Sequence, residues 1–190
     1  MPRKKSKFEI VVFTIGIIAQ PDWTIPNSYL ARGEPKYGFL VSSGNIDSMV
    51  AHYTAAKKKR SDDYYSPGGK AGRRPDRACI VYSNRIREAY GDVPIILGGL
   101  EASLRRLAHY DYWDDKVRRS VLVDTSATLL MYGMGEKSIL ECVRWVEDGM
   151  PQERLPEMRG VCYLAKTPPK GVEMLPSHAD IAADKKMYAK

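Results

Sequence analysis

The chain has 190 residues and 44% of them are hydrophobic, which is enough for one sizeable domain with its own core. Lys and Arg outnumber Asp and Glu by 30 to 23, and the net charge of +7 permits anionic partners without requiring them. No apolar run approaches the ~18 residues of a membrane-spanning helix, so we expect no membrane contact and a cytoplasmic location.

The first segment superficially resembles a signal peptide, because basic residues precede an apolar run. Glu9 interrupts the start of that run, however, and no small-x-small cleavage site follows it. Residues 8–19 are rich in Val, Ile and Phe, which favours a central strand. Pro21 and Pro26 would end it.

A second strand is predicted over residues 37–41, followed by a helix. The apolar residues of this helix share one face at the spacing i, i+3, i+4 and i+7: Ile46, Met49, Val50 and Tyr53. Asn45 is the expected N-cap, and Asp47 lies in the first turn, where a carboxylate suits the helix dipole. The basic run 57–60 would close the helix, an interpretation that we weigh above nucleic-acid binding.

Residues 61–74 form a polar loop with three glycines and a proline, either a flap over a ligand or a mobile surface segment. A helix is then predicted from Pro75 to a C-cap at Gly91. Its buried face would contain Cys79, Tyr82, Ser83, Ile86 and Tyr90. A strand over residues 79–82 is the alternative.

Two apolar runs that end in glycine dominate the next part of the chain. Residues 93–97 meet Gly98 and Gly99, and residues 129–132 meet Gly133 and Gly135. Such runs are typical of parallel strands that are buried on both faces. The helix after Gly99 should turn four residues inward and Arg105 and Arg106 outward; the inward set is Ala102, Leu104, Leu107 and Ala108.

The most regular helix is predicted over residues 136–149, with Gly149 at its end and Pro151 beyond. Its apolar stripe comprises Ile139, Leu140, Val143 and Val146. Residues 161–164 fit a short edge strand. From residue 167 onward prolines and charges predict a linker without a closing element.

Strands that alternate with helices at this spacing predict an α/β fold: a doubly wound, mostly parallel sheet with helices on both faces. Ligands of such sheets bind beyond the carboxyl ends of the strands. The candidate ligand or interface residues at these ends are Asn45, Asp47, Gly98, Gly99, Glu101, Gly133, Gly135 and Glu136. Glu101 and Glu136 could accept hydrogen bonds from a ribose or stabilise a loop.

Residues 105–119 are unusually dense in arginine, aspartate and aromatic residues. One interpretation is a site for an anionic or aromatic group, with arginines as bidentate clamps and rings as stacking surfaces. The other is an internal knot of ion pairs that ties the loop to the sheet. Both stay open for the remaining candidate residues: Arg105, Arg106, His109, Tyr110, Asp111, Tyr112, Trp113, Arg118 and Arg119.

Neither a metal site nor a catalytic group is predicted. Cys79, Cys142 and Cys162 match no zinc, iron–sulfur or redox spacing and are expected to be buried thiols. His109, Asp111 and Asp114 have no diagnostic metal-ligand spacing. No Ser–His–Asp, Cys–His or Walker-type arrangement occurs.

The two strand–glycine–helix units resemble the cobalamin-binding-like domain that precedes the catalytic barrel of many radical SAM enzymes. Longer strings look like the N-terminal domain of YgiQ-type radical SAM proteins. These strings are GIIAQPDW at 16–23, GNIDSM at 44–49, YT at 53–54, RRPDR at 73–77, LGGLEASLRR at 97–106, HYDYW at 109–113 and KVRRSVLVD at 116–124.

The resemblance implies a Rossmann-like N-terminal accessory domain over residues 8–165 and a linker over residues 166–190 that leads to a catalytic radical SAM domain. A 4Fe–4S cluster and S-adenosylmethionine are implied for the full-length protein, which we expect to be an enzyme of unknown substrate. The family's Cys-x-x-x-Cys-x-x-Cys motif is absent here, so this chain alone should hold no cofactor and not be catalytic.

Two other family features are missing. The domain lacks an upstream strand and helix and is therefore expected to be incomplete at its N-terminus. It also lacks the Asp-x-His-x-x-Gly motif of cobalamin ligation, so cobalamin is not expected.

Two further functions were weighed. A nucleotide- or nucleic-acid-binding module would use the basic residues at 57–60, 73–74 and 118–119. A stand-alone Rossmann-like enzyme is the weakest alternative, because no Gly-x-Gly-x-x-Gly loop follows the first strand.

Overall fold

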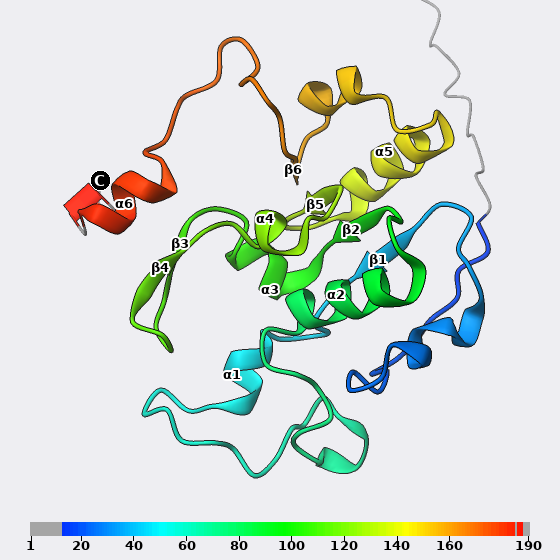
Figure 1. The fold of residues 1–190 in the computed structure, drawn as a ribbon, viewed down its shortest axis with the longest axis vertical. Helices are drawn as coiled ribbons and strands as arrows, with labels where there is room; N and C mark the ends of the chain where they lie inside the picture. Colours follow the sequence, from blue (N-terminus) through cyan, green and yellow to red (C-terminus); the bar gives the residue numbers. More distant parts are fainter. Residues whose placement is uncertain (1–12, 185, 188–190) are drawn as a thin grey trace, which may run out of the picture.

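The computed structural model describes residues 13–184, 186 and 187. Its centre is a four-stranded sheet with the order β1-β2-β5-β6 (Figure 1). The strands are β1 (Phe39–Val41), β2 (Ile95–Leu97), β5 (Leu129–Met131) and β6 (Val161–Cys162). The first three are parallel and β6 is antiparallel to β5. The predicted α/β fold with a mostly parallel sheet is therefore confirmed.

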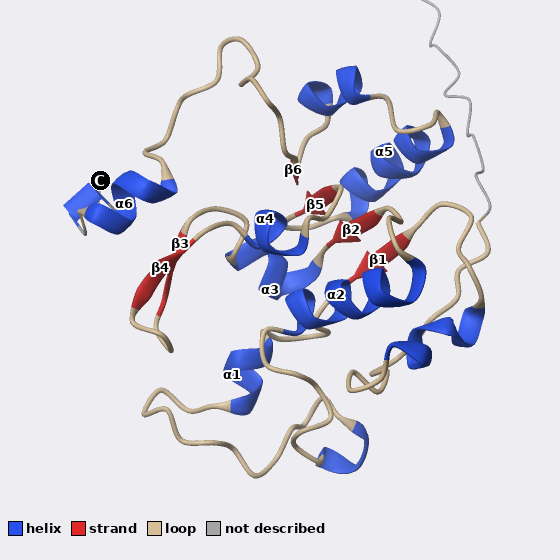
Figure 2. Ribbon diagram, viewed as in Figure 1, coloured by secondary structure: helices blue, strands red, loops and turns tan. Residues whose placement is uncertain are grey.

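Helices cover both faces of this sheet (Figure 2). One face turns Ile95 and Leu97 toward a core formed with α2 (Ala78–Tyr90), α4 (Val121–Thr125) and the 3-10 helix η1 (Pro26–Arg32). The opposite face turns Ile96 and Leu129 toward α5 (Glu136–Glu147) and η3 (Gln152–Glu157). Because side chains alternate along a strand, continuous apolar runs are needed to supply both cores.

The helix predicted after Pro75 is α2, which begins at Ala78, so the alternative of a strand at 79–82 is wrong. Four of the five residues assigned to its inner face are buried: Cys79, Tyr82, Ser83 and Ile86. Gly91 follows with φ +71°, a conformation that favours glycine, and its N–H donates to the Arg87 carbonyl.

The predicted first strand is wrong where the structure describes it. Residues 13–19 form no strand, and the side chains of Ile15 and Ile17 are 72% and 74% exposed. Residues 8–12 of that prediction lie outside the described residues. Although residues 13–19 are mostly apolar, they do not pair with the sheet.

Helix α1 (Ser48–His52) is shorter than predicted, and its phase is wrong. Asp47 rather than Asn45 is the N-cap and accepts from the backbone N–H groups of Met49 and Val50. The buried face contains Asp47, Ser48, Ala51 and His52, whereas Val50 is exposed. The basic run 57–60 lies in the loop beyond the helix. Polar side chains with internal partners take the buried positions here.

Two other helices bury fewer apolar residues than predicted. Helix α3 (Gly99–Leu104) buries Ala102, but it ends at Leu104, and both Leu104 and Leu107 are exposed. Helix α5 is confirmed, but its buried face is Ser138, Cys142 and Trp145, and Leu140 of the predicted stripe is 62% exposed.

Several of the described elements were not predicted. Residues 109–118 form a separate antiparallel hairpin of β3 (His109–Asp111) and β4 (Lys116–Arg118), and α4 follows it. The expected linker contains α6 (His178–Ala183), which packs on β4 and buries Ile181. In the polar loop 61–74 the 3-10 helix η2 (Pro67–Gly69) forms a single turn. None of the described helices is long and apolar enough to cross a membrane.

Candidate functional site

The carboxyl ends of β1, β2 and β5 point toward α1, α3 and the hairpin (Figure 1). The ends of β1 and β2 are joined by the Gly98 N–H, which donates to the Val41 carbonyl at 2.9 Å. Gly99 has φ +81°, and a Cβ there would lie 2.5 Å from the Ser42 hydroxyl oxygen. Glycine is needed here because the loop after β1 packs against its backbone.

Two buried carboxylates lie beyond this edge. Glu101 accepts from the backbone N–H groups of Ser48 and Cys79, both at 2.9 Å, and from the Ser48 hydroxyl at 2.6 Å. It therefore ties the start of α1 to the start of α2. Asp47, besides capping α1, forms an ion pair with the half-buried Arg105. Both carboxylates therefore bind donors that belong to the chain itself.

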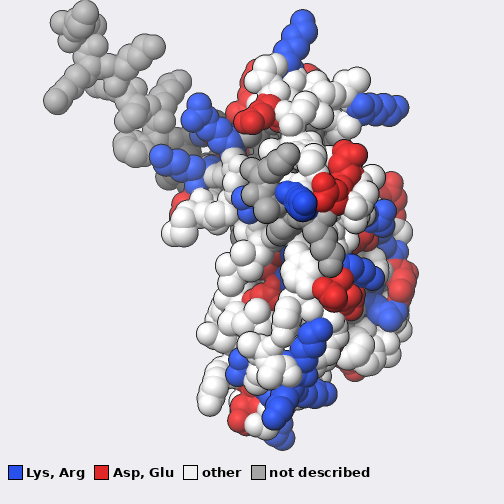
Figure 3. Space-filling model, turned by 90° about the vertical axis from the view of Figure 1, so that its left-hand side faces the viewer, with Lys and Arg blue, Asp and Glu red and all other residues white. Residues whose placement is uncertain are grey.

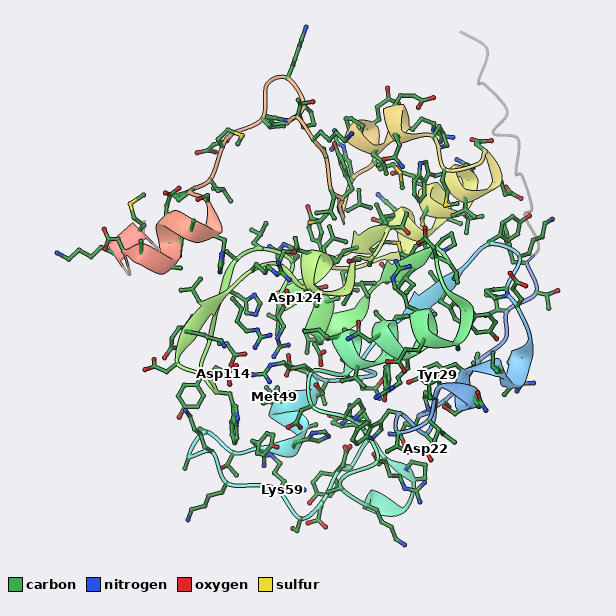
Figure 4. The ribbon with its side chains drawn as sticks, viewed as in Figure 1. Asp22, Tyr29, Met49, Lys59, Asp114 and Asp124 are labelled. Carbon is green, nitrogen blue, oxygen red and sulfur yellow. The ribbon has the colours of Figure 1, made fainter. Side chains whose placement is uncertain are left out.

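An ion-pair network connects the hairpin to α4 and to Arg77, the N-cap residue of α2. Figure 4 labels two of its carboxylates, Asp114 and Asp124. The Arg77 Nη2 atom lies 2.9 Å from carboxylate oxygens of both Asp111 and Asp114. Arg118 continues the network from Asp114, at 2.9 Å, to Asp124 on α4, at 3.9 Å. Burial raises the pKa of Asp111, but the hydrogen bonds from Arg77 and from the backbone N–H groups of Asp114 and Trp113, together with the Arg77 charge, hold that pKa below its ordinary value.

Arg119 pairs with Asp124 as well. The arginines at the base of the hairpin are therefore neutralised by aspartates within the chain. These ion pairs are the ones that the interpretation as an internal knot expects, and the interpretation of the same residues as a ligand site stays a prediction.

Aromatic contacts hold the turn of the hairpin. The rings of Trp113 and Tyr53 have centroids 4.1 Å apart, and Lys57 donates from Nζ to the Trp113 carbonyl at 3.0 Å. The Lys57 ammonium also lies 4.9 Å from the Tyr112 ring centroid. The Tyr112 hydroxyl donates to the Ala55 carbonyl, and the Tyr110 hydroxyl donates to Asp115. These contacts fix the turn against the loop after α1.

The structure does not bring the other candidate residues into this cluster. Asn45 and Glu136 are exposed, on the loop before α1 and in the first turn of α5. The Gly133 N–H donates to the Ser103 hydroxyl at 3.3 Å, and Gly135 is the N-cap position of α5. Arg106 stacks on Tyr132, 4.8 Å from its ring centroid.

His109 is half-buried and its Nδ1 lies 3.1 Å from the Leu107 carbonyl. Burial lowers the pKa of His109 below its ordinary value, which favours the neutral imidazole.

Sequence reasoning missed two polar clusters near α1. In one, Asp76 accepts from Tyr53, at 2.7 Å, and contacts the Nδ1 of the buried His52 at 2.6 Å. In the other, the buried Arg74 and Asp63 form a bidentate ion pair with contacts of 2.8–3.0 Å. The only sequence signal for both is the charged run 73–77.

The basic side chains proposed for nucleic-acid binding are largely used within the chain. Figure 3 shows Lys and Arg gathered at the lower end of the molecule, over the loop that follows α1. Of these, Lys57 is bound to the hairpin and the Arg60 Nε donates to the Val50 and Tyr53 carbonyls. Arg74 is buried and Arg118 is paired.

A hollow of about 360 Å³ lies at the opposite edge of the sheet, between Tyr37, Tyr90 and Pro94. These residues precede β1, end α2 and precede β2, so the hollow is at the amino ends of the strands. It contains none of the candidate residues.

The cysteines lie apart: Cys79 is in the core on the α2 face and Cys142 is in the core on the α5 face. Burial raises the pKa of the Cys142 thiol to about 11 and also raises the pKa values of Cys79 and Cys162. Across residues 13–184, 186 and 187, no three His, Cys, Asp or Glu side chains are grouped so that they could hold a metal ion. We therefore assign no cluster ligand to this part of the chain.

The fold and the glycine-ended parallel strands define a Rossmann-like α/β domain with an ion-pair network at its carboxyl edge. A family model described as Radical SAM N-terminal matches residues 7–190. The chain belongs to this family.

Its relatives include a UPF0313 protein of Clostridium botulinum (strain 657), 58% identical over 179 residues, and one of Geobacter sulfurreducens, 53% identical over 180 residues. The alignments cover 93% of this chain but only 28% and 30% of those proteins. No solved structure matches the chain.

The resemblance to the N-terminal domain of YgiQ-type radical SAM proteins is thereby confirmed, and the chain corresponds to the N-terminal part of longer proteins. The family implies a 4Fe–4S cluster and S-adenosylmethionine for the full-length protein.

Proposed function

We propose that this chain is the accessory domain of a radical SAM iron–sulfur protein, which packs against a catalytic barrel and helps to form its active site. The observation that carries the proposal is the family match over residues 7–190 in a chain that spans 28–30% of its relatives. The cluster and the barrel would belong to the remaining part of those proteins, and the substrate stays unassigned.

The chemistry of the described residues supports this division of labour. At the carboxyl edge Asp47 is paired with Arg105 and Asp111 with Arg77, and Glu101 accepts hydrogen bonds from Ser48 and Cys79. Burial raises the pKa of the Cys142 thiol to about 11. Such a domain offers shape and rigidity rather than reactive groups. The full-length protein would supply the reductive cleavage of S-adenosylmethionine.

Anaerobic iron–sulfur reconstitution tests the proposal. This chain should be compared with a chimaera that joins it to the downstream region of the Clostridium botulinum relative. Iron content and reductive cleavage of S-adenosylmethionine should appear only in the chimaera. A cluster in the short chain, or an inert chimaera next to an active full-length relative, would contradict the proposal.

A further inference from the structure

Helix α3 has two unlike faces. Its inner face buries Glu101 and Ala102. Its outer face exposes two leucines at the spacing i, i+4: Leu100 is 45% exposed and Leu104 is 59% exposed. Leu107, three residues beyond the helix, is 47% exposed. A helix in a domain of this size normally turns its apolar side inward. The apolar side of α3 faces outward because the inner positions are occupied by the buried Glu101 network.

A fourth apolar side chain belongs to the same surface. Met134 is 83% exposed and follows Gly133, whose N–H donates to Ser103 on α3 at 3.3 Å. Helix α3 also packs on β5, the strand that leads to Met134. We define the α3 patch as Leu100, Leu104, Leu107 and Met134.

The α3 patch has the composition of an interface. Its centre is apolar, whereas Arg106 at its margin stacks on Tyr132 and donates to the Ser103 carbonyl at 2.6 Å. An apolar centre with a polar rim is typical of surfaces that bind other proteins. The patch also lies at the carboxyl ends of the strands, where α/β sheets place their functional contacts.

The length and course of the chain indicate what covers this patch. The Clostridium botulinum relative has about 72% of its length outside the alignment. The last described helix, α6, packs on β4 of the hairpin, and His178 contacts the Val117 carbonyl at 3.3 Å. The chain therefore runs past the hairpin, beside which α3 lies in Figure 1.

We propose that the α3 patch is the docking surface for the downstream catalytic region of the longer protein. This inference rests on the proposed function and adds the contact surface to it. The docked region presents an apolar face to the four side chains of the patch. The Ser120 hydroxyl and the Val121 N–H donate to the Arg106 and Arg105 carbonyls, so the segment after the hairpin is tied to the end of α3.

Amide hydrogen exchange locates the docking surface. Exchange is measured in this chain alone and in the chimaera that carries the downstream region of the Clostridium botulinum relative. We expect amides of residues 99–107 and 132–136 to exchange at least tenfold more slowly in the chimaera. The double variant Leu104→Glu/Met134→Glu should restore the exchange rates of the isolated chain.

Leu30→Glu is the matched control, because Leu30 is 42% exposed on η1, on the other side of the molecule (Figure 1). It should leave the protection intact. The melting temperatures of both variants are measured in the isolated chain to verify folding. They should stay close to that of the unchanged chain, because the substituted side chains are exposed.

Three outcomes would overturn the inference. Protection at another surface of the chimaera would move the docking site and leave the proposed function standing. Absence of new protection anywhere would contradict the packing in the proposed function itself. Concentration-dependent protection of the α3 patch in the isolated chain, with a dimer in sedimentation, would assign the patch to a second copy.

Discussion

Single buried carboxylates determine how the first two helices meet. Glu101 is 1% exposed and receives three hydrogen bonds, two from Ser48 and one from Cys79. Glu101→Ala would leave these donors without an acceptor, and we expect the free energy of unfolding to fall by about 3 kcal/mol. Urea denaturation followed by circular dichroism measures this change.

Glu136→Ala is the control for Glu101, because Glu136 is exposed at the start of α5. Its loss should change stability by less than about 0.5 kcal/mol. Equal effects of the two substitutions would mean that Glu101 is not a structural residue, and its role as a ligand acceptor would regain support.

The Asp63–Arg74 pair makes a second prediction at the residue scale. Both side chains are buried, and Asp63 also accepts from Ser66 at 2.8 Å. Asp63→Asn leaves a buried guanidinium without its counter-ion, and we expect a loss of about 3 kcal/mol. Asp62→Asn, on the exposed neighbour, should have little effect.

This loss should depend on pH. Burial raises the pKa of Asp63, but hydrogen bonds from Ser66, Arg74 and the Tyr65 N–H, together with the Arg74 charge, keep that pKa below its ordinary value. A depressed pKa in the folded state contributes stability above the unfolded pKa of about 3.9, and this contribution is lost as the pH falls through the folded pKa. The stability difference between Asp63→Asn and the unchanged chain should thus shrink below about pH 4.

At the scale of elements, the hairpin depends on residues far away in sequence. Arg77 binds both Asp111 and Asp114 and is the link between the hairpin and α2. Arg77→Met should free the hairpin, so that amides of residues 109–118 exchange faster by about tenfold or more while those of α2 change little. Arg85→Met removes an exposed ion pair on the same helix and is the control. Unchanged exchange in the hairpin would show that the Tyr53–Trp113 stack suffices.

The difference between the apolar central strands and the polar hairpin explains which elements the sequence could predict. Strands β2 and β5 and the glycines behind them were predictable because both faces of each strand are buried, so the whole run is apolar. In β1 only one face is buried: Val41 lies in the core on the α2 face, whereas Leu40 is 59% exposed. The hairpin was not predictable, because its strands are polar and are held by Arg77, which is 34 residues from Asp111. Local periodicity cannot reveal an ion pair between residues that are so far apart in the sequence.

Helix α1 shows the related failure for a candidate site. Its inner positions carry Asp47, Ser48 and His52, whose partners are Arg105, Glu101 and Asp76. A periodicity argument assumes that apolar residues face inward, so it assigned the wrong face of α1 to the core. Asp47 and Glu101 were correctly placed at the carboxyl edge, but their partners within the fold could not be deduced from spacing.

At the scale of the molecule, the two cores share one sheet and should unfold together. Cys79 lies in the core on the α2 face and Cys142 in the core on the α5 face, and both are at most 1% exposed. Their thiols report separately on the two faces. Because β2 supplies Ile95 to one core and Ile96 to the other, loss of either core exposes the strand that supports its neighbour.

Ile86→Ala tests this coupling, since it creates a cavity on the α2 face alone and should cost about 3 kcal/mol. Labelling of each cysteine in increasing urea, resolved by peptide mass spectrometry, should show one midpoint for Cys79 and Cys142. The substitution should lower both midpoints equally, whereas Leu140→Ala, at an exposed position of α5, should move neither. A shift confined to Cys79 would mean that the faces unfold independently and that the three parallel strands do not couple them.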